Sequence, residues 1–87
     1  MGGYGTWFIF HGVVLMKQQY LERYYEIHGD FCGLVQAGGA SARQMLKYVE
    51  RDIANIESGA WKHVTDRCLE RRLRSLENVY VQLKEFV

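Results

Sequence analysis

A periodic apolar seam in the C-terminal part of the chain most constrains how the chain can fold. Apolar residues recur there at steps of three or four: Leu69, Leu73, Leu76, Tyr80, Leu83 and Val87. This is the spacing of one helix face that packs lengthwise on another helix. Val79 and Phe86 widen the stripe, which favours a bundle over an isolated two-stranded coiled coil. The seam therefore predicts a long helix within residues 61–87.

The residues around the seam indicate that this helix has more than one neighbour. Trp61, Val64 and Cys68 lie on a helix face rotated from the leucines, so we expect a second packing contact near the start of the helix. Arg72 and Glu77 flank the seam with charges that suit a contact with a partner.

Two further helical patterns precede the seam. Met16, Tyr20, Tyr24 and Ile27 form one apolar stripe, and His28-Gly29-Asp30 interrupts it because Gly29 can end a helix. Residues 31–37 are then either a helical continuation past a kink or a separate short helix, closed by Gly38-Gly39.

Ser41 and Gln44 have the form of a capping box, and they open the next predicted helix. Its core-facing residues are Met45, Leu46, Val49, Ile53 and Ile56, and its water-facing residues are mostly Arg43, Lys47, Glu50, Arg51, Asp52 and Asn55. Ser58-Gly59 ends this helix and Ala60-Trp61 begins the last one, so the short link predicts an antiparallel hairpin.

The predicted fold class is all-α: a small helical bundle of two or three main helices with a C-terminal antiparallel helical hairpin. We expect one helical domain over residues 1–87, with 1–6 as a flexible N-terminal tail. The chain has only 87 residues, of which 48% are hydrophobic and 14% aromatic. A lone three-helix unit does not easily hide that much apolar surface, so we expect oligomerisation to complete the bundle.

The stretch 7–16 is apolar apart from His11 and Gly12. It is too short to span a bilayer and lacks the basic region of a signal peptide. Its aromatic and β-branched residues suit a strand, but nothing else in the chain reads as a convincing partner strand, so we interpret it as the opening of a buried helix. A hairpin about Gly12, an interfacial membrane anchor and an upstream extension before Met16 are the alternatives.

The sequence contains no recognisable enzyme motif. A Gly-rich phosphate loop, a nucleophile elbow and a metalloprotease motif are all absent, so we expect no enzymatic activity and no cofactor. Among the metal-ligand types, only His28 and Cys32 have helical spacing, and two ligands do not make a site, so no metal is predicted. Cys32 and Cys68 do not form a disulfide framework, which favours reduced thiols in a cytoplasmic protein, although one bridge is sterically conceivable.

Two groups of side chains are candidates for anion or nucleic-acid binding. On the last predicted helix, a basic stripe projects away from the leucines: His63, Arg67, Arg71 and Arg74. Four tyrosines accompany Lys17, Arg23, Arg43 and Lys47, and could stack bases: Tyr20, Tyr24, Tyr25 and Tyr48. The structural alternatives are a solvated helix face with a Glu70–Arg74 pair, and tyrosines that belong to the core.

The leading functional hypothesis is a non-enzymatic protein–protein interaction module that self-associates and binds a protein partner. Its predicted interface is the seam with its aromatic neighbours: Trp61, Leu69, Leu73, Leu76, Tyr80, Leu83 and Phe86. The second hypothesis is nucleic-acid or nucleotide binding through the basic stripe and the tyrosines. The net charge of +1 gives no global attraction for polyanions, which favours the protein partner. The third, less favoured, is peripheral membrane association through residues 7–16.

Overall fold

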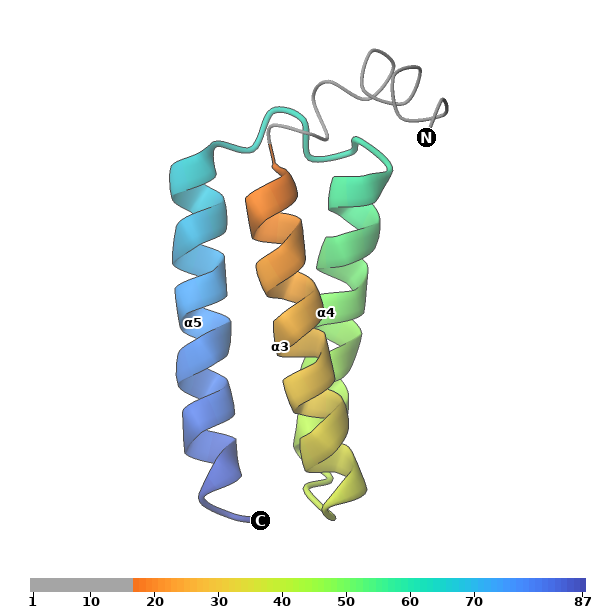
Figure 1. Cartoon of the computed structure of the whole chain (residues 1–87), viewed down its shortest axis with the longest axis vertical. Helices are drawn as coiled ribbons and strands as arrows, with labels where there is room; N and C mark the ends of the chain where they lie inside the picture. Colours follow the sequence, from red (N-terminus) through yellow and green to blue (C-terminus); the bar gives the residue numbers. More distant parts are fainter. Residues whose placement is uncertain (1–16) are drawn as a thin grey trace, which may run out of the picture.

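Residues 17–87 fold into a bundle of three helices that run side by side with alternating direction (Figure 1). The computed structural model describes residues 17–87, and these contain α3 (Gln18–Gln36), α4 (Ala42–Glu57) and α5 (Asp66–Lys84) without any strand. The predictions for 1–6, for the apolar stretch 7–16 and for Met16 lie outside the described residues. Over the rest of the chain, the all-α prediction is confirmed.

The first of these helices, α3, is the central element of the bundle, with α4 on one side and α5 on the other (Figure 1). It buries Tyr20, Leu21, Tyr24, Ile27, Phe31 and Leu34 at helical spacing. That stripe continues without a break past Gly29, so the predicted helix end at Gly29 is wrong and the alternative of helical continuation is confirmed. A glycine inside a helix is unfavourable by about 1 kcal/mol relative to Ala, and the packed side chains on both sides of it outweigh that loss.

The turns are made by other glycines. Gly38 has a φ angle of 97° and follows α3, while Gly59 has a φ angle of 80° and follows α4. These left-handed conformations favour glycine because it has no Cβ. Gly59 confirms the predicted end of α4. At the start of α4, however, the Ser41 side chain makes no capping hydrogen bond, so the predicted capping box does not form.

The last helix starts later than the sequence suggested. Thr65 is its N-cap, with an extended backbone and a hydroxyl that accepts a hydrogen bond from the Cys68 N–H at 3.2 Å. Asp66 adds a carboxylate in the first turn, where the helix dipole favours it. The prediction that Ala60-Trp61 begins the helix is wrong, because residues 58–63 form turns instead.

The leucine seam belongs to the core of the single chain. Leu69 and Leu73 are fully buried and Leu76 is nearly so, and they pack with the α3 stripe and with Val49, Ile53 and Ile56 of α4. The ring of Phe31 meets that of Tyr80 edge to face, with the ring centroids 5.8 Å apart. The seam therefore packs lengthwise on another helix, as its spacing predicted, and that helix is α3.

The helices α4 and α5 are antiparallel, as predicted for consecutive helices, but they are not the closest pair. The backbones of both approach α3 along their lengths, whereas they approach each other at few points. On the side where α4 faces α5, the two helices are therefore joined mainly by long side chains and not by close approach of their backbones.

Replacing a seam leucine tests the assignment of the core. We expect Leu76→Ala to lower the free energy of unfolding by about 2–5 kcal/mol, because it removes buried methyl groups and leaves a cavity. Gln82→Ala, on the exposed face of the same helix, should change it by less than about 0.5 kcal/mol. Urea unfolding of both variants measures the difference, and equal small losses would place the core on another face.

Candidate functional site

A buried carboxylate ties the three helices together at one point. Asp52 of α4 is 3% exposed. It accepts a hydrogen bond from the Tyr24 hydroxyl of α3 at 2.7 Å, and Arg72 of α5 donates to both of its oxygens at 2.9 Å. The Arg72 guanidinium also lies over the Trp61 ring, 4.9 Å from its centroid. This cluster closes the gap between α4 and α5 at the level of Arg72.

The electrostatics of the cluster shift the pKa values of Tyr24 and Arg72. Burial, with the neighbouring Asp52 carboxylate, raises the pKa of Tyr24 far above its usual value, so the phenol stays neutral. Burial opposes the charge on Arg72, but its hydrogen bonds to Asp52 and Tyr24 raise its pKa overall. Each polar group is satisfied, which a buried ion pair requires in order to be tolerated.

Sequence reasoning missed this cluster. Asp52 was predicted to face water mostly and Arg72 to suit a partner contact, and the burial and contacts above correct both predictions. Tyr24 was a candidate for stacking, with the core as the alternative, and the structure places it in the core. By its spacing, Asp52 falls on the polar face of its predicted helix. Nothing in the sequence showed that Tyr24 and Arg72 would contact it from two other helices.

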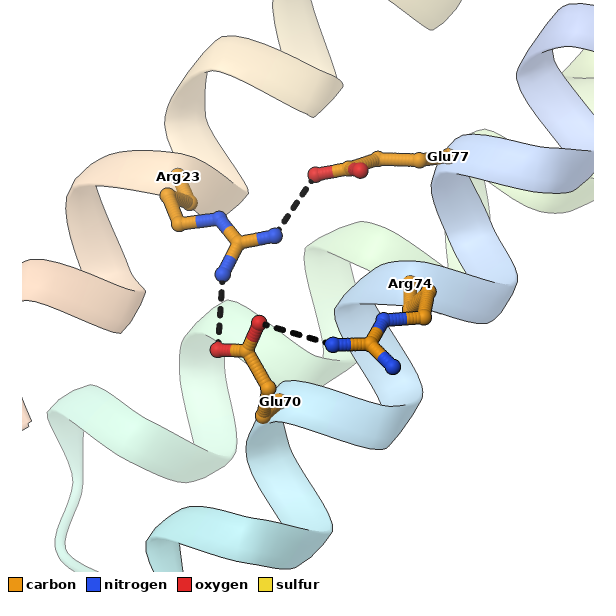
Figure 2. A network of polar contacts seen from close by, with 4 residues as sticks. All are labelled: Arg23, Glu70, Arg74 and Glu77. Carbon is orange, nitrogen blue, oxygen red and sulfur yellow. Dashed lines mark hydrogen bonds and ion pairs between the residues drawn. The ribbon is translucent and has the colours of Figure 1, made fainter.

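A second ion-pair network joins α3 to α5 on the surface (Figure 2). Arg23 donates to Glu70 at 2.8 Å and to Glu77 at 2.7 Å, and Arg74 lies 3.7 Å from Glu70. Glu77 is therefore engaged within the chain rather than free for a partner, and Arg74 forms the predicted helical pair with Glu70. These side chains are partly solvated, so each pair contributes little to stability.

Below the Arg72 cluster, a groove opens between α4 and α5. It has a volume of about 290 Å³ and is lined by Met45, Tyr48, Arg71, Arg72, Ser75, Leu76 and Val79. A second hollow of about 380 Å³ is lined by Leu34, residues 38–42, Leu83, Phe86 and Val87. Ala42 precedes Met45 by about one turn and Leu83 follows Val79 by about one turn, so the hollows succeed each other along the same side. We call these two successive hollows together the α4–α5 groove.

The predicted interface residues divide between the core and this groove. Leu69 and Leu73 are fully covered by the chain itself, so an interface in this fold has to use other side chains, whereas Leu76 is 7% exposed and lines the groove. Trp61, Tyr80 and Leu83 are partly buried against the core, and Phe86 is 84% exposed at the lower end of the groove.

The basic stripe is incomplete. His63 lies in the turn segment before α5, so it does not continue the helix face of Arg67, Arg71 and Arg74, and that part of the prediction is corrected. The three arginines line a hollow of about 480 Å³ together with Tyr20, Asp66 and Glu70. Arg67 and Arg71 make no ion pair with another residue of 17–87.

The tyrosines do not gather into a stacking platform. Tyr20 and Tyr24 are buried, and the hydroxyl of the half-exposed Tyr25 donates to Glu57. Tyr48, 44% exposed, lines the groove with Arg71, and the edge of the buried Tyr20 lines the hollow of the three arginines. Lys17, considered beside the tyrosines, is buried and donates to the Val64 carbonyl.

The metal-ligand types also have defined positions. Cys32 Sγ lies 3.8 Å from His28 Nδ1, as their spacing on a continuous helix allows, and His28 Nε2 lies 3.1 Å from Glu50. Cys32 and Cys68 are both free thiols. Over residues 17–87, no three His, Cys, Asp or Glu side chains are grouped for a metal ion. None of the three described helices is long and apolar enough to cross a membrane.

Comparison with known proteins found no matching family model, curated protein or solved structure. The function of the groove is therefore inferred from its own geometry and chemistry.

The Asp52 cluster and the surface network should differ in their effect on stability. Asp52→Ala leaves the Tyr24 hydroxyl buried without its acceptor, and we expect a loss of about 1–3 kcal/mol in the free energy of unfolding. Arg23→Gln removes only solvated pairs and should lower it by less than about 1 kcal/mol. Denaturant unfolding compares the two, and a larger loss for Arg23→Gln would contradict the structural role of Asp52.

Proposed function

We propose that this chain is a non-enzymatic protein-interaction module that receives another polypeptide in the α4–α5 groove. The observation that carries the proposal is the combination of an apolar floor, from Met45, Leu76 and Val79, with a rim that includes the cation of Arg71. Grooves of this kind between helices are typical binding places for a partner helix. The free thiols Cys32 and Cys68 support a reducing, cytoplasmic setting for the module.

The apolar residues along the groove are incompletely covered by one chain. Met45 and Val79 are partly exposed, Tyr48 is 44% exposed and Phe86 is 84% exposed. Removing such surface from water contributes about 25 cal/mol for each Å². A partner that covers the groove would therefore gain binding energy from residues that already stand in fixed positions on two rigid helices.

Self-association is part of the same proposal, since every copy carries this apolar surface. A homo-oligomer was expected because 87 residues supply a modest core, and the exposed Phe86 and Val87 supply apolar surface for such contacts. Which polypeptide fills the groove is a separate question from whether the groove binds one.

Site-specific photo-cross-linking tests the proposal. A photoreactive amino acid at Ser75, on the groove rim, should cross-link to protein in a native lysate, because the partner lies within reach of that position. The same group at Glu26, on the exposed face of α3, is the matched control and should give much less adduct. Equal adducts from both positions, or none from Ser75, would contradict the proposal; the adduct mass separates a second copy from another protein.

Nucleic-acid binding is the second candidate function, and one observation favours it. Tyr48 and Arg71 line the same groove, which places an aromatic face beside a cation. The alternative is weakened by Arg74, which is engaged by Glu70, and by Asp66 and Glu70, which lie among the arginines.

The triple replacement of Arg67, Arg71 and Arg74 by Gln separates the two functions. For a protein-binding module, we expect the wild-type chain to bind oligonucleotides weakly or not at all at physiological salt. If it binds polyanions, the triple variant should reduce the slope of log affinity against log salt by up to about three, roughly 0.9 for each lost contact on duplex DNA. Fluorescence anisotropy measures both, and circular dichroism checks that the variant stays helical, since Arg and Gln have similar helix propensity.

A further inference from the structure

We infer that the occupant of the α4–α5 groove is an acidic amphipathic helix of another protein. This inference rests on the proposed function and adds the length, polarity pattern and charge of the partner. It is carried by three properties of the groove: where it is closed, how its apolar residues are spaced, and which charges surround it.

The ends of the groove set the length of the partner. The Arg72–Asp52 pair and the Trp61 ring close it at one end, and Phe86 marks the other. From Arg72 to Leu83, α5 rises about 17 Å at 1.5 Å per residue, and Phe86 lies beyond. An occupant that covers the whole groove is therefore a helix of about three to four turns.

The apolar residues of the groove favour a helix over an extended segment. On the α5 side they succeed one another at steps of three and four, from Leu76 to Val79, Leu83 and Phe86, and Met45 faces them from α4. A helix with apolar residues at the same steps can place its side chains between these ridges, as in other helical bundles. An extended segment would leave unpaired backbone groups against Met45 and Val79.

The charge around the groove selects an acidic partner. By helical spacing, the outer rim is formed by Gln44, Tyr48 and Arg51 on α4, and by Arg71, Ser75, Asn78 and Gln82 on α5. Glu85 continues this spacing at the Phe86 end of the groove. Toward the Arg72 end, none of these rim residues carries a negative charge, and Arg71 has no ion pair within residues 17–87. The buried Asp52 is already neutralised by Arg72. A carboxylate on the partner beside Arg71 is thus the complementary group.

The same charges disfavour the other occupants. A second copy packed parallel on this face would bring its own Arg51 and Arg71 toward the first pair. An antiparallel copy would offer each Arg71 a single carboxylate, that of Glu85, and none to Arg51. A nucleic acid could pair with Arg71 through its phosphates, but its backbone would not cover the apolar floor at Met45 and Val79. An acidic helix satisfies the rim and the floor together.

A charge reversal at Ser75 tests the inference. Ser75 is exposed and lies one turn after Arg71, so replacing it should leave the core intact. The probe is a synthetic four-turn helical peptide with leucines at steps of three and four and glutamates beside them, labelled for fluorescence anisotropy against the full chain. A matched peptide with glutamine in place of glutamate is the control.

We expect the acidic peptide to bind more tightly than its glutamine control, and the difference to shrink in Arg71→Gln. In Ser75→Glu the new carboxylate engages Arg71, so the affinity for the acidic peptide should fall by about two- to fivefold, the size expected for a solvated ion pair. Ser75→Lys should raise that affinity. A purely steric effect would weaken binding in both Ser75 variants. Salt should weaken the wild-type complex. Arg43→Gln, away from the groove on α4, should change nothing.

Three results would overturn the inference. The first is equal affinity for both peptides, and the second is a loss of affinity for the acidic peptide in both Ser75 variants. The third is a dimer, detected by light scattering, that Ser75→Lys and Ser75→Glu both disrupt. The last result would assign the groove to a second copy and leave the proposed interaction module standing. If no peptide binds and Ser75 yields no cross-link, both the inference and the proposed function fail.

Discussion

The Asp52 carboxylate is the interaction on which the arrangement of the three helices depends. Within residues 17–87, it is the one point where side chains from α3, α4 and α5 meet a single buried charge. The apolar core alone can be filled by helices that slide or rotate slightly, since hydrophobic burial has little directionality. The directed hydrogen bonds from Tyr24 and Arg72 to one carboxylate fix the register of α4 against the other two helices, as buried polar contacts do in some helical assemblies.

This constraint also explains where the bundle is open. Both α4 and α5 use their most apolar faces against α3, and Arg72 bridges the remaining gap at one level only. Beyond that level, Met45 and Val79 face each other across a space that neither fills. The groove is thus a result of two helices that both pack against the central α3 and only sparsely against each other.

The helical spacing of the apolar residues predicted the fold because it marks the faces of the helices that are buried. The leucine seam and the stripe of Val49, Ile53 and Ile56 identified helix faces that the structure buries. The helix end predicted at Gly29 was wrong because glycine ends a helix only where packing of the flanking residues does not stabilise the helix. The start of α5 at Thr65-Asp66 had a local signal, an N-cap hydroxyl followed by an acidic first turn, which the apolar Trp61 obscured. The burial of Asp52, and the position of Tyr48 and Arg71 in one groove, depend on how the helices pack together, which no single-helix pattern encodes.

The central position of α3 has a consequence for how the chain reaches this structure. The helices α3 and α4 are neighbours in sequence, so their contacts close a short loop. Contacts between α3 and α5 join residues far apart, such as Arg23 with Glu70 and with Glu77, at separations of 47 and 54 residues. Loop-closure entropy rises with separation, and long-range contacts slow folding. We therefore expect the hairpin of α3 and α4 to form first and α5 to dock on it, so that the apolar face of the hairpin is exposed until the seam covers it.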